Sequence, residues 1–582
     1  MTVWLAILTI LLPWAGAICV WWIGDRHPSA QHISATIFSV LAGLTALALL
    51  PFTSDKVVLS IPLGTVFGDF TLVLDGLGVF LAVVAAVVGS LAVLFSNDYM
   101  HGEAQLGRYY ALVLLFIGAM IGLSLSGSLL LMFIFWEITA FCSYALISFY
   151  NDDPKAVAGG IKALIMTQLG GVGLLAGALV AYSYLGSYQI QAFLAGAETL
   201  PANVLSLIAF GFLIAAAAKS AQVPLHTWLP DAMEAPTPVS ALIHAATMVN
   251  AGVYLLARFY PAFEAVPGWT ISVITVGMLS AFLAAIMALV CNDLKRTLAY
   301  STISQLGYMV FAIGCGGIYA SQFHLMSHAV FKALLFLGAG AVIHATGTRD
   351  MRQMGGLGAQ MPFVRGVFII GSLALAGLPI ANGFFSKELV LESGLAEGPL
   401  WAYLFMLLGA GITALYTMRM VWMVFYGKPS RAIHVHDAPR AMRISLGVLA
   451  FGTLTTWLLA GPFSRFLADS LPYHNLHTES TVALIQEIVT APATWIALVV
   501  IAVGLAAWFN RARLTGLAHS LQPLASFAGR GMGFDGLNEQ IVALTRKSAS
   551  AMGVSQTGLL SWNVVGIIGG LIITLILLAW VG

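Results

Sequence analysis

The chain has 582 residues, of which 60% are hydrophobic and only 8% are charged, whereas a soluble protein usually carries about 25% charged residues. This composition indicates a membrane protein with many spans, and a net charge of +1 argues against nucleic acid as a partner. The four cysteines lie in apolar segments without metal-binding spacing, and there is no nucleotide-binding glycine loop. We therefore expect neither a metal nor a cofactor in this chain.

Apolar stretches long enough to cross a bilayer, about 20 residues each, recur along the chain and predict an all-α fold. The first stretch lacks a basic leader, and we expect it to be an anchor that is not cleaved. We expect sixteen transmembrane helices, over residues 2–23, 31–52, 77–96, 109–126, 128–150, 161–185, 203–228, 238–260, 269–291, 300–317, 321–345, 362–390, 400–426, 443–462, 494–509 and 561–581.

Lysines and arginines gather in the loops that follow odd-numbered spans, among them Lys162, Lys295, Arg296 and Arg349. These loops hold twelve basic residues, and the loops that follow even-numbered spans hold three. Basic loops tend to stay in the cytoplasm. The pattern therefore predicts a multi-pass protein of the cell inner membrane, with both termini on the non-cytoplasmic side.

One predicted span ends in a proline-rich stretch beside a lysine. The stretch AAAAKSAQVPLHTWLPDAMEAPTPVSALIHAATM covers residues 215–248 and contains Lys219, Pro224 and Pro230. A lysine at bilayer depth costs at least about 2.5 kcal/mol, and prolines remove backbone donors that lipid cannot replace. Both features are tolerable beside water, so we predict a broken helix at a hydrated site.

A second span shows the same combination. In the stretch ALAGLPIANGFFSKELV, the residues Gly377, Pro379 and Gly383 interrupt an apolar run shortly before Lys387. Paired broken helices in corresponding positions are typical of transporters built from inverted repeats. The two breaks lie five spans apart, which predicts two inverted repeats of five helices each.

This reading divides the chain into six parts. They are N-terminal helices (1–108), a first repeat (109–260), a second repeat (269–426), additional helices (427–509), a lateral amphipathic segment (510–560) and a last transmembrane helix (561–582).

Few ionisable residues remain inside the spans once the loop charges are set aside. Glu137 lies about nine residues into its span, near the bilayer midplane. His324, His328 and Lys332 follow one another at intervals of four residues and so share a helix face. A water-linked series of such groups is what proton transfer through a membrane requires. The predicted proton-transfer residues are Glu137, Lys219, His244, His324, His328, Lys332 and Lys387.

Each of these residues also has a purely structural interpretation. Glu137 and Lys219 would serve as a buried ion pair that fixes helix register. His244 would be a hydrogen-bonded core residue, and Lys387 would extend its charge to the membrane surface. The joint pattern favours proton transfer, because histidine and desolvated lysine exchange protons near neutral pH.

Several motifs resemble one known family over about residues 60–430. They are FWEITAFCSYALISF, KSAQVPLHTWLPDAMEAPTPVSALIHAATMV, DLKRTLAYSTISQLGYM, FHLMSHAVFKALLFLGAGAVIH and GLPIANGFFSKE. They resemble the antiporter-like subunits of respiratory complex I, of Mrp cation/proton antiporters and of membrane-bound hydrogenases. Overall the chain is most similar to the distal subunit of complex I.

The resemblance implies fourteen or more helices in two inverted five-helix repeats, and a proton-translocating subunit without redox groups of its own. Its partners would be other membrane subunits and lipids, with quinone, flavin, Fe–S or NiFe sites in the partner subunits. Its only substrate would be H⁺, with Na⁺ as the alternative. The resemblance also implies residue roles: an ion pair of Glu137 with Lys219, a central axis through His244, His328 and Lys332, and an exit at Lys387.

Three functions remain open at this point. The first is a pump subunit driven by redox chemistry in partners, of the NADH:quinone oxidoreductase or hydrogenase type. The second is a subunit of an Mrp-type Na⁺/H⁺ antiporter, and the third couples proton flow to the uptake of inorganic carbon. All three would use the same buried line of residues.

The chain's C-terminal part differs from the family's long lateral strut. Residues from Phe534 to Met552 place apolar side chains at helical spacing, with charged residues elsewhere. This pattern predicts a short amphipathic helix on the cytoplasmic face, with a solvated linker as the alternative.

Overall fold

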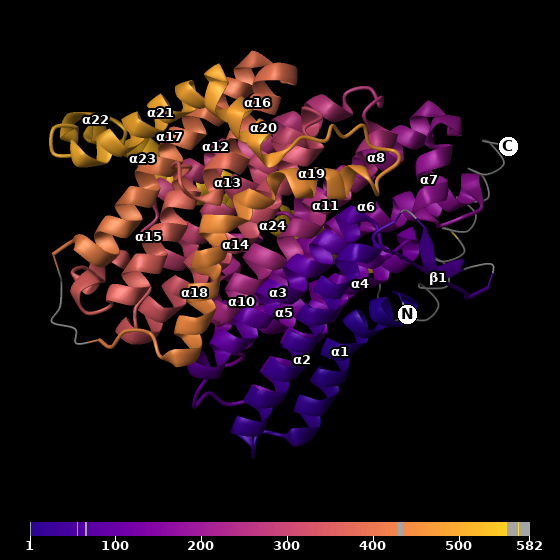
Figure 1. Cartoon of the computed structure of the whole chain (residues 1–582), viewed down its shortest axis with the longest axis horizontal. Helices are drawn as coiled ribbons and strands as arrows, with labels where there is room; N and C mark the ends of the chain where they lie inside the picture. The colour runs from indigo at the N-terminus through magenta and orange to yellow at the C-terminus, as the bar shows by residue number, and fades with distance from the viewer. Residues whose placement is uncertain (1, 55, 65–66, 429–434, 556–568, 570–582) are drawn as a thin grey trace. The chain divides into compact units, whose positions relative to one another are not determined.

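The computed structural model describes residues 2–54, 56–64, 67–428, 435–555 and 569 (Figure 1). The chain divides into two units, Met1–Gln522 and Pro523–Gly582. Helices make up nearly all of the described structure, which confirms the predicted all-α class. The exception is one antiparallel pair of strands, β1 (Val57–Pro62) and β2 (Asp69–Val73), which the sequence patterns did not predict.

The N-terminal helices of the first unit form a layer against the next helices of the chain. Helix α1 packs on α2 and α4, and α2 packs on α3. Large apolar side chains point outward from α1, for example Trp22, which is 84% exposed. An apolar exterior of this kind suits contact with lipid. The bounds are α1 (Thr2–Ile23), α2 (Pro28–Leu49), η1 (Leu50–Phe52) and α3 (Gly76–Tyr99).

The helices between residues 106 and 263 contain the first break. Helix α8 ends at Lys219, and the chain then turns through two short helices before it re-enters the bundle. The bounds are α4 (Leu106–Leu125), α5 (Leu129–Ile147), α6 (Pro154–Leu185), α7 (Ile190–Gly196), η2 (Ala197–Thr199), α8 (Ala202–Lys219), α9 (Trp228–Asp231), η3 (Ala232–Glu234), α10 (Thr237–Ala241), the π-helical η4 (Leu242–Ala246) and α11 (Met248–Phe263).

The next helices contain the second break, between α15 and α16. Helices α12 and α13 pack closely because Gly277 and Gly307 face each other; a Cβ on Gly307 would lie 2.6 Å from the Gly277 carbonyl oxygen. The bounds are α12 (Trp269–Val290), α13 (Leu294–Gly314), α14 (Ile318–Thr346), η5 (Met351–Gln353), η6 (Leu357–Ala359), α15 (Pro362–Ala376), α16 (Asn382–Glu397), α17 (Leu400–Val421) and the π-helical η7 (Trp422–Tyr426).

The remaining helices of the first unit cover α3, α14, α16 and α17. In Figure 1 α16, α20 and α21 lie at the top of the view, and the turn between α1 and α2 lies at the bottom. The bounds are α18 (Arg440–Thr455), η8 (Thr456–Leu459), α19 (Ala460–Ala468), α20 (Thr481–Thr490), α21 (Pro492–Phe509), α22 (Thr515–Ser520) and α23 (Gln522–Gly529), the last of which continues into the second unit.

The second unit contains η9 (Gly531–Gly533) and α24 (Phe534–Ser555). The predicted helix from Phe534 to Met552 is thus confirmed as a helix, and large apolar side chains such as Leu544 are exposed on it. Its placement on the cytoplasmic face stays a prediction.

Thirteen of the described helices are long and apolar enough to span a membrane. The predicted span 300–317 corresponds to α13, which is helical but falls outside this set, and 362–390 is split into α15 and α16. The predicted span 561–581 lies outside the described residues, apart from Gly569. The number sixteen and the inverted relation of the repeats therefore stay predictions.

Candidate functional site

Four lysines of the described chain are buried, and each ammonium group donates a hydrogen bond to a backbone carbonyl oxygen. They are Lys219 (to Trp136, 2.8 Å), Lys295 (to Ala235, 2.6 Å), Lys332 (to Leu298, 3.1 Å) and Lys387 (to Leu375, 2.8 Å). Charged groups avoid protein interiors unless they are paired or functional. The four lysines therefore mark the polar interior of the bundle.

The first break places Lys219 at the last residue of α8, against α5. Its Nζ lies 4.9 Å from the centre of the Trp136 ring. Trp136 directly precedes Glu137 in the sequence. Glu137 accepts a hydrogen bond from Gln168 of α6 and interacts electrostatically with Lys219. The described residues show no direct ion pair between Glu137 and Lys219, in contrast to the pair that the resemblance implied.

The break itself occupies residues 220–227, where Pro224 lies in the turn and Pro230 falls inside the four-residue helix α9. The predicted interruption of this helix is thus present. Ser220 donates a hydrogen bond to the Val249 carbonyl at 2.6 Å and so ties the turn to α11.

His244 lies in the π-helical segment η4 and is fully buried. Thr247 and Asn250 donate hydrogen bonds, both of 2.8 Å, to carbonyls of this segment. Neither ring nitrogen of His244 has a hydrogen-bond partner among the described residues. π-Helical turns inside α-helices occur frequently at functional sites.

Helix α14 presents His324, His328 and Lys332 to the interior, as predicted from their spacing. The ring of Phe336 connects this helix to His244, since its centre lies 4.8 Å from the His244 ring centre and 5.9 Å from the Lys332 Nζ. Lys332 also donates to the Ser301 hydroxyl of α13. Residues of the predicted first repeat (109–260) and second repeat (269–426) thus lie close together around the Phe336 ring.

The other end of the histidine series contacts the second broken helix. His324 hydrogen-bonds to Ser386 at 2.9 Å and to Gln305 at 3.1 Å. His328 has no hydrogen-bond partner for either ring nitrogen among the described residues, and its ring centre lies 6.5 Å from that of His324. Ser386 directly precedes Lys387.

The second break has the conformation that its glycines predict. Helix α15 ends before Gly377, which has a φ of +76°, and Pro379 lies in the linker. Gly383, the second residue of α16, lies so close to α15 that a Cβ would overlap the Ala374 carbonyl oxygen. Helix ends leave carbonyls without intrahelical partners, and Lys387 donates to one of them, that of Leu375.

A band of buried polar side chains runs between the two breaks. Each carries an atom without a hydrogen-bond partner among the described residues, and such atoms in proteins are usually satisfied by internal water. These side chains are Gln222, Ser240, His244, Asn250, Gln305, Ser321, Gln322, Ser327, His328 and Asn382. The helices that carry them pack on one another through α14.

Beyond Lys387 the site continues toward a cavity of about 380 Å³. Glu388 follows Lys387 and is 1% exposed, and Glu392, one turn later, lines the cavity with Glu397, His477, Glu479 and Glu487. We call this region the acidic end. Helix α20 lies outside the membrane-spanning helices, and burial, together with the carboxylates of Glu392 and Glu479, raises the pKa of Glu487 there to about 7.

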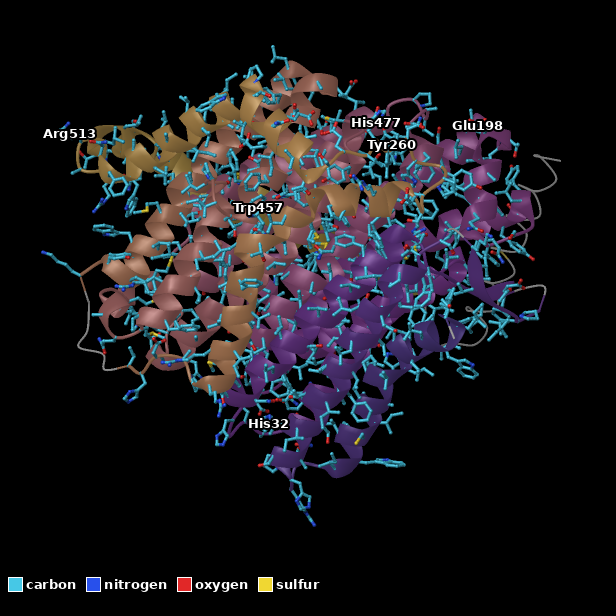
Figure 2. The ribbon with its side chains drawn as sticks, viewed as in Figure 1. His32, Glu198, Tyr260, Trp457, His477 and Arg513 are labelled. Atoms are coloured by element: carbon cyan, nitrogen blue, oxygen red, sulfur yellow. The ribbon has the colours of Figure 1, made fainter. Side chains whose placement is uncertain are left out.

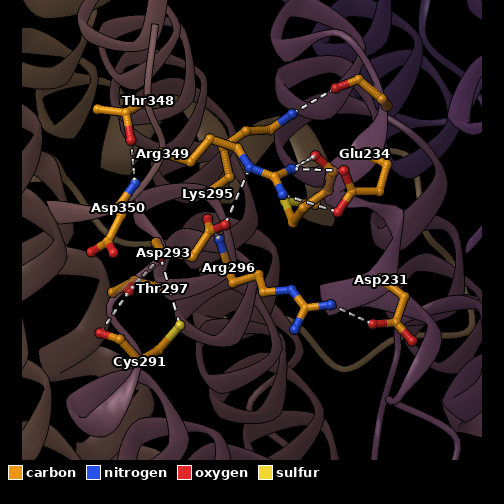
Figure 3. Close-up of polar contacts among 12 residues, drawn as sticks. Asp231, Glu234, Cys291, Asp293, Lys295, Arg296, Thr297, Thr348, Arg349 and Asp350 are labelled. Atoms are coloured by element: carbon orange, nitrogen blue, oxygen red, sulfur yellow. Dashed lines mark hydrogen bonds and ion pairs between the residues drawn. The ribbon is translucent and has the colours of Figure 1, made fainter. Parts of the chain in front are cut away.

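The opposite end of the bundle carries an ion-pair cluster, which we call the basic end (Figure 3). Asp231 pairs with Lys162 and Arg296, both at 2.8 Å. Arg349 pairs with Glu234 at 3.0 Å and with Asp293 at 3.2 Å. The cluster therefore joins the first break to α13 and to the loop after α14.

The two ends lie far apart along α14. Its first residues, Ile318 and Tyr319, line the acidic cavity, and its last residue, Thr346, precedes Arg349 by only three positions. Its 29 residues correspond to about 44 Å at 1.5 Å per residue. Figure 2 shows His477, which lines the acidic cavity, near the top of the view.

Six of the seven predicted residues are buried, namely Lys219, His244, His324, His328, Lys332 and Lys387, whereas Glu137 is half-buried. Their part in proton transfer stays a prediction. The sequence patterns missed Lys295, which was counted among the loop charges but is 3% exposed. They also missed the neutral partners, namely Gln168, Ser301, Gln305 and Ser386. Lys295 lies outside the predicted span 300–317, and the available signal was Asp293 two positions earlier, because aspartate is a preferred helix cap.

Comparisons with known proteins define the class. Residues 126–413 match the model of the NADH:quinone oxidoreductase/Mrp antiporter membrane family, and residues 61–110 match the N-terminal region of complex I chain 5. The chain belongs to this family of antiporter-like membrane subunits. The chain is a multi-pass membrane protein, and its relatives are subunits of multisubunit membrane complexes.

Individual relatives sharpen this placement. NADH-quinone oxidoreductase subunit L of Escherichia coli is 36% identical, and the alignment covers 98% of both chains. F420H2 dehydrogenase subunit L of Methanosarcina mazei is 42% identical over 66% of this chain and 63% of that protein. The Mrp complex of Dietzia sp. DQ12-45-1b superimposes with a TM-score of 0.84 at 28% identity, covering 99% of this chain and 62% of that chain.

Proposed function

We propose that this chain translocates protons as a membrane subunit of a redox-driven, complex I-like pump. The observation that supports this best is the group of fully buried ionisable side chains at Lys219, His244, His324, His328, Lys332 and Lys387, together with buried polar atoms that have no hydrogen-bond partner among the described residues. Full-length similarity to a quinone oxidoreductase subunit supports the redox-driven type over the Mrp type.

The proposed route uses the residues in spatial order. Protons reach Lys219 beside Glu137, pass to His244 and then to Lys332, whose side chain shares the Phe336 ring with His244. They continue through His328 and His324 to Lys387 and leave through the acidic end. Water would bridge the gaps, because imidazole and ammonium groups pass protons only across hydrogen bonds.

Carbonyl-bound lysines suit this role. A desolvated ammonium group releases its proton readily, and an approaching carboxylate holds the proton in place. Lys219 is bound to the Trp136 carbonyl, so a small movement of its ammonium group would bring it to the neighbouring Glu137. We propose that this movement between two acceptors controls proton loading.

The direction of transport follows from the charges of the two ends. We propose that the basic end faces the cytoplasm, in keeping with the predominance of lysine and arginine in cytoplasmic loops, and that the acidic end faces the other side. Redox groups would lie in partner subunits, and the chain itself would supply only the proton route.

The test uses the assembled complex in inverted membrane vesicles energised with NADH. Acidification of the vesicle interior, followed with a pH-sensitive dye, should be equally fast in sodium-free buffer and in buffer with sodium. Proton movement that requires Na⁺ and persists without NADH would instead indicate an Na⁺/H⁺ antiporter, as in the Na(+)/H(+) antiporter subunit A1 of Staphylococcus aureus, which is 38% identical.

A further inference from the structure

A buried lysine outside the route described above lies between the basic end and His244. Lys295 occupies the first turn of α13, two positions after the capping residue Asp293. Its side chain is 3% exposed, although it belongs to a part of the chain that otherwise carries loop charges. A lysine that needed only solvent would extend outward from this position, so its inward direction requires a reason.

The lysine reaches the segment that leads into the π-helix. Its Nζ donates a 2.6 Å hydrogen bond to the carbonyl oxygen of Ala235, as Figure 3 shows beside Arg349. Ala235 follows Glu234 at the end of the first break, and α10 and η4 begin just after it. Helix α13 also packs directly on η4.

Polar groups continue from this point toward His244. Ser240 is fully buried, and its hydroxyl has no hydrogen-bond partner among the described residues. It precedes His244 by four residues and so lies on nearly the same side of the helix. The charge of Lys295 acts on His244, as does that of Lys332.

Charged groups also surround Lys295 on its outer side. Arg349, Asp293 and Glu234 act on it electrostatically, and the Arg349 and Glu234 side chains are 34% and 16% exposed. Lys295 therefore has solvent-accessible ionisable groups on one side and the unpartnered groups of the central band on the other.

We propose that Lys295 is a second point of proton entry, which passes protons from the Glu234–Arg349 pair to His244 independently of Lys219. The proposal rests on the proposed function, since it adds an entry to that route. The step is a proton transfer only: the Lys295 ammonium gives its proton through Ser240 or water to the His244 imidazole and regains one from the basic end.

The alternative is a purely structural role, in which Lys295 only holds the Ala235 carbonyl. Three substitutions separate the two roles. Glutamine keeps a hydrogen-bond donor but carries no exchangeable charge, arginine keeps the charge but does not release its proton, and histidine exchanges protons near neutrality. A carbonyl anchor is satisfied by any of the three, whereas a proton-transfer group is replaced only by histidine.

The experiment measures NADH-driven vesicle acidification per assembled complex for Lys295→Gln, Lys295→Arg and Lys295→His. Lys155→Gln is the matched control, because it removes one positive charge from an exposed position outside the ion-pair cluster. We expect normal assembly, acidification about tenfold slower or worse with glutamine and arginine, partial recovery with histidine and a near-normal rate in the control.

Two results would overturn the proposal: acidification by Lys295→Gln within about twofold of the unchanged protein, or failed assembly of all three variants, which would assign a structural role. A parallel Lys332→Gln variant separates this outcome from failure of the proposed function. If Lys332→Gln also pumps normally, the whole route is wrong; if only Lys295→Gln pumps normally, the second entry is wrong.

Discussion

Each of the two broken helices holds a buried lysine next to a helix end, but the two lysines are held with different geometry. In the first, Lys219 precedes a long break and donates to a carbonyl on another helix, α5. In the second, Lys387 follows a short break and donates to the end of its own broken helix, at Leu375. The acidic neighbours differ in the same way: Glu137 belongs to α5, whereas Glu388 is adjacent to Lys387 in the sequence.

This difference separates a responsive site from a fixed one. The environment of Lys219 depends on how α8 sits against α5 and α6, so helix movement would change it. Lys387 and its acceptor Leu375 belong to the two halves of one broken helix, and the ring of Tyr308 on α13 faces the ammonium group at 5.7 Å. We therefore expect the first break to control proton loading and the second to control release.

The largest effect is expected from Glu137→Gln. The amide keeps the size of the side chain and its contact with Gln168 but removes the charge that attracts the Lys219 ammonium. Proton pumping should fall by about a hundredfold, the scale of a lost proton-transfer group, while the complex assembles normally. If Glu137→Gln pumps at the normal rate in energised vesicles, Glu137 and Lys219 are not coupled. Glu103→Gln, at an exposed position, is the control.

Lys387→Arg should have the next largest effect. If Lys387 only extends its charge toward water, arginine replaces it well. A proton-releasing group needs to lose its proton, which arginine does not do in proteins, so pumping should fall roughly tenfold with assembly unchanged. Assembly is checked by native gel and pumping in vesicles, with Lys155→Arg as an exposed control; full pumping by Lys387→Arg would remove it from the mechanism.

Much of the helical fold was predictable because membrane helices carry a strong local signal. Long apolar runs and the glycines and prolines at the breaks placed α1–α5, α12, α14 and the interruption after α15 within a few residues, whereas α6 begins seven residues earlier and α8 ends nine residues earlier than predicted. The strands β1 and β2 were missed because they are short and do not alternate between buried and exposed residues: β1 is mostly exposed, whereas the last three residues of β2 are buried. The number of spans was less predictable, since α13 carries many polar residues.

The candidate site was predictable where charge stood out against an apolar background, as at Glu137, Lys219 and Lys387. Sequence spacing also placed His324, His328 and Lys332 on one face. It failed for Lys295 and for the direction of the Lys219 ammonium, because both depend on contacts between segments far apart in the chain. Neutral residues such as Gln305 gave no signal at all.

Gly383→Ala should weaken the second break without touching an ionisable group. Its Cβ would overlap the Ala374 carbonyl, a backbone atom that cannot move aside freely, and overpacking of this kind costs about 1–3 kcal/mol. The thermal transition of the purified complex should fall. Gly366→Ala in α15 is the control: its Cβ meets nothing within 4 Å, so it should be neutral or stabilising. Equal transitions for both variants would contradict the close approach.

The smallest effect concerns the acidic end and depends on pH. Burial, with Glu392 and Glu479 nearby, raises the pKa of Glu487 to about 7, above the usual value near 4.3 for glutamate. Between these two values the folded protein holds a proton that the unfolded chain has released, so the contribution of Glu487 to stability falls as the pH rises toward 7 and is fully lost above it.

Glu487→Gln mimics the protonated side chain at every pH and should abolish this loss. Between pH 5.5 and pH 8, the temperature of the thermal transition should therefore fall slightly more for the unchanged complex than for the variant. The upper limit of pH 8 lies about one unit above the raised pKa. Because Glu487 is partly exposed, solvent screening keeps the difference small. Glu198→Gln, an exposed residue of η2 seen in Figure 2, should keep the pH dependence of the unchanged complex. If Glu487→Gln and the unchanged complex have the same pH dependence, the Glu487 carboxyl ionises freely. The acidic cavity would then be an open surface that exerts no control over the Lys387 end of the route.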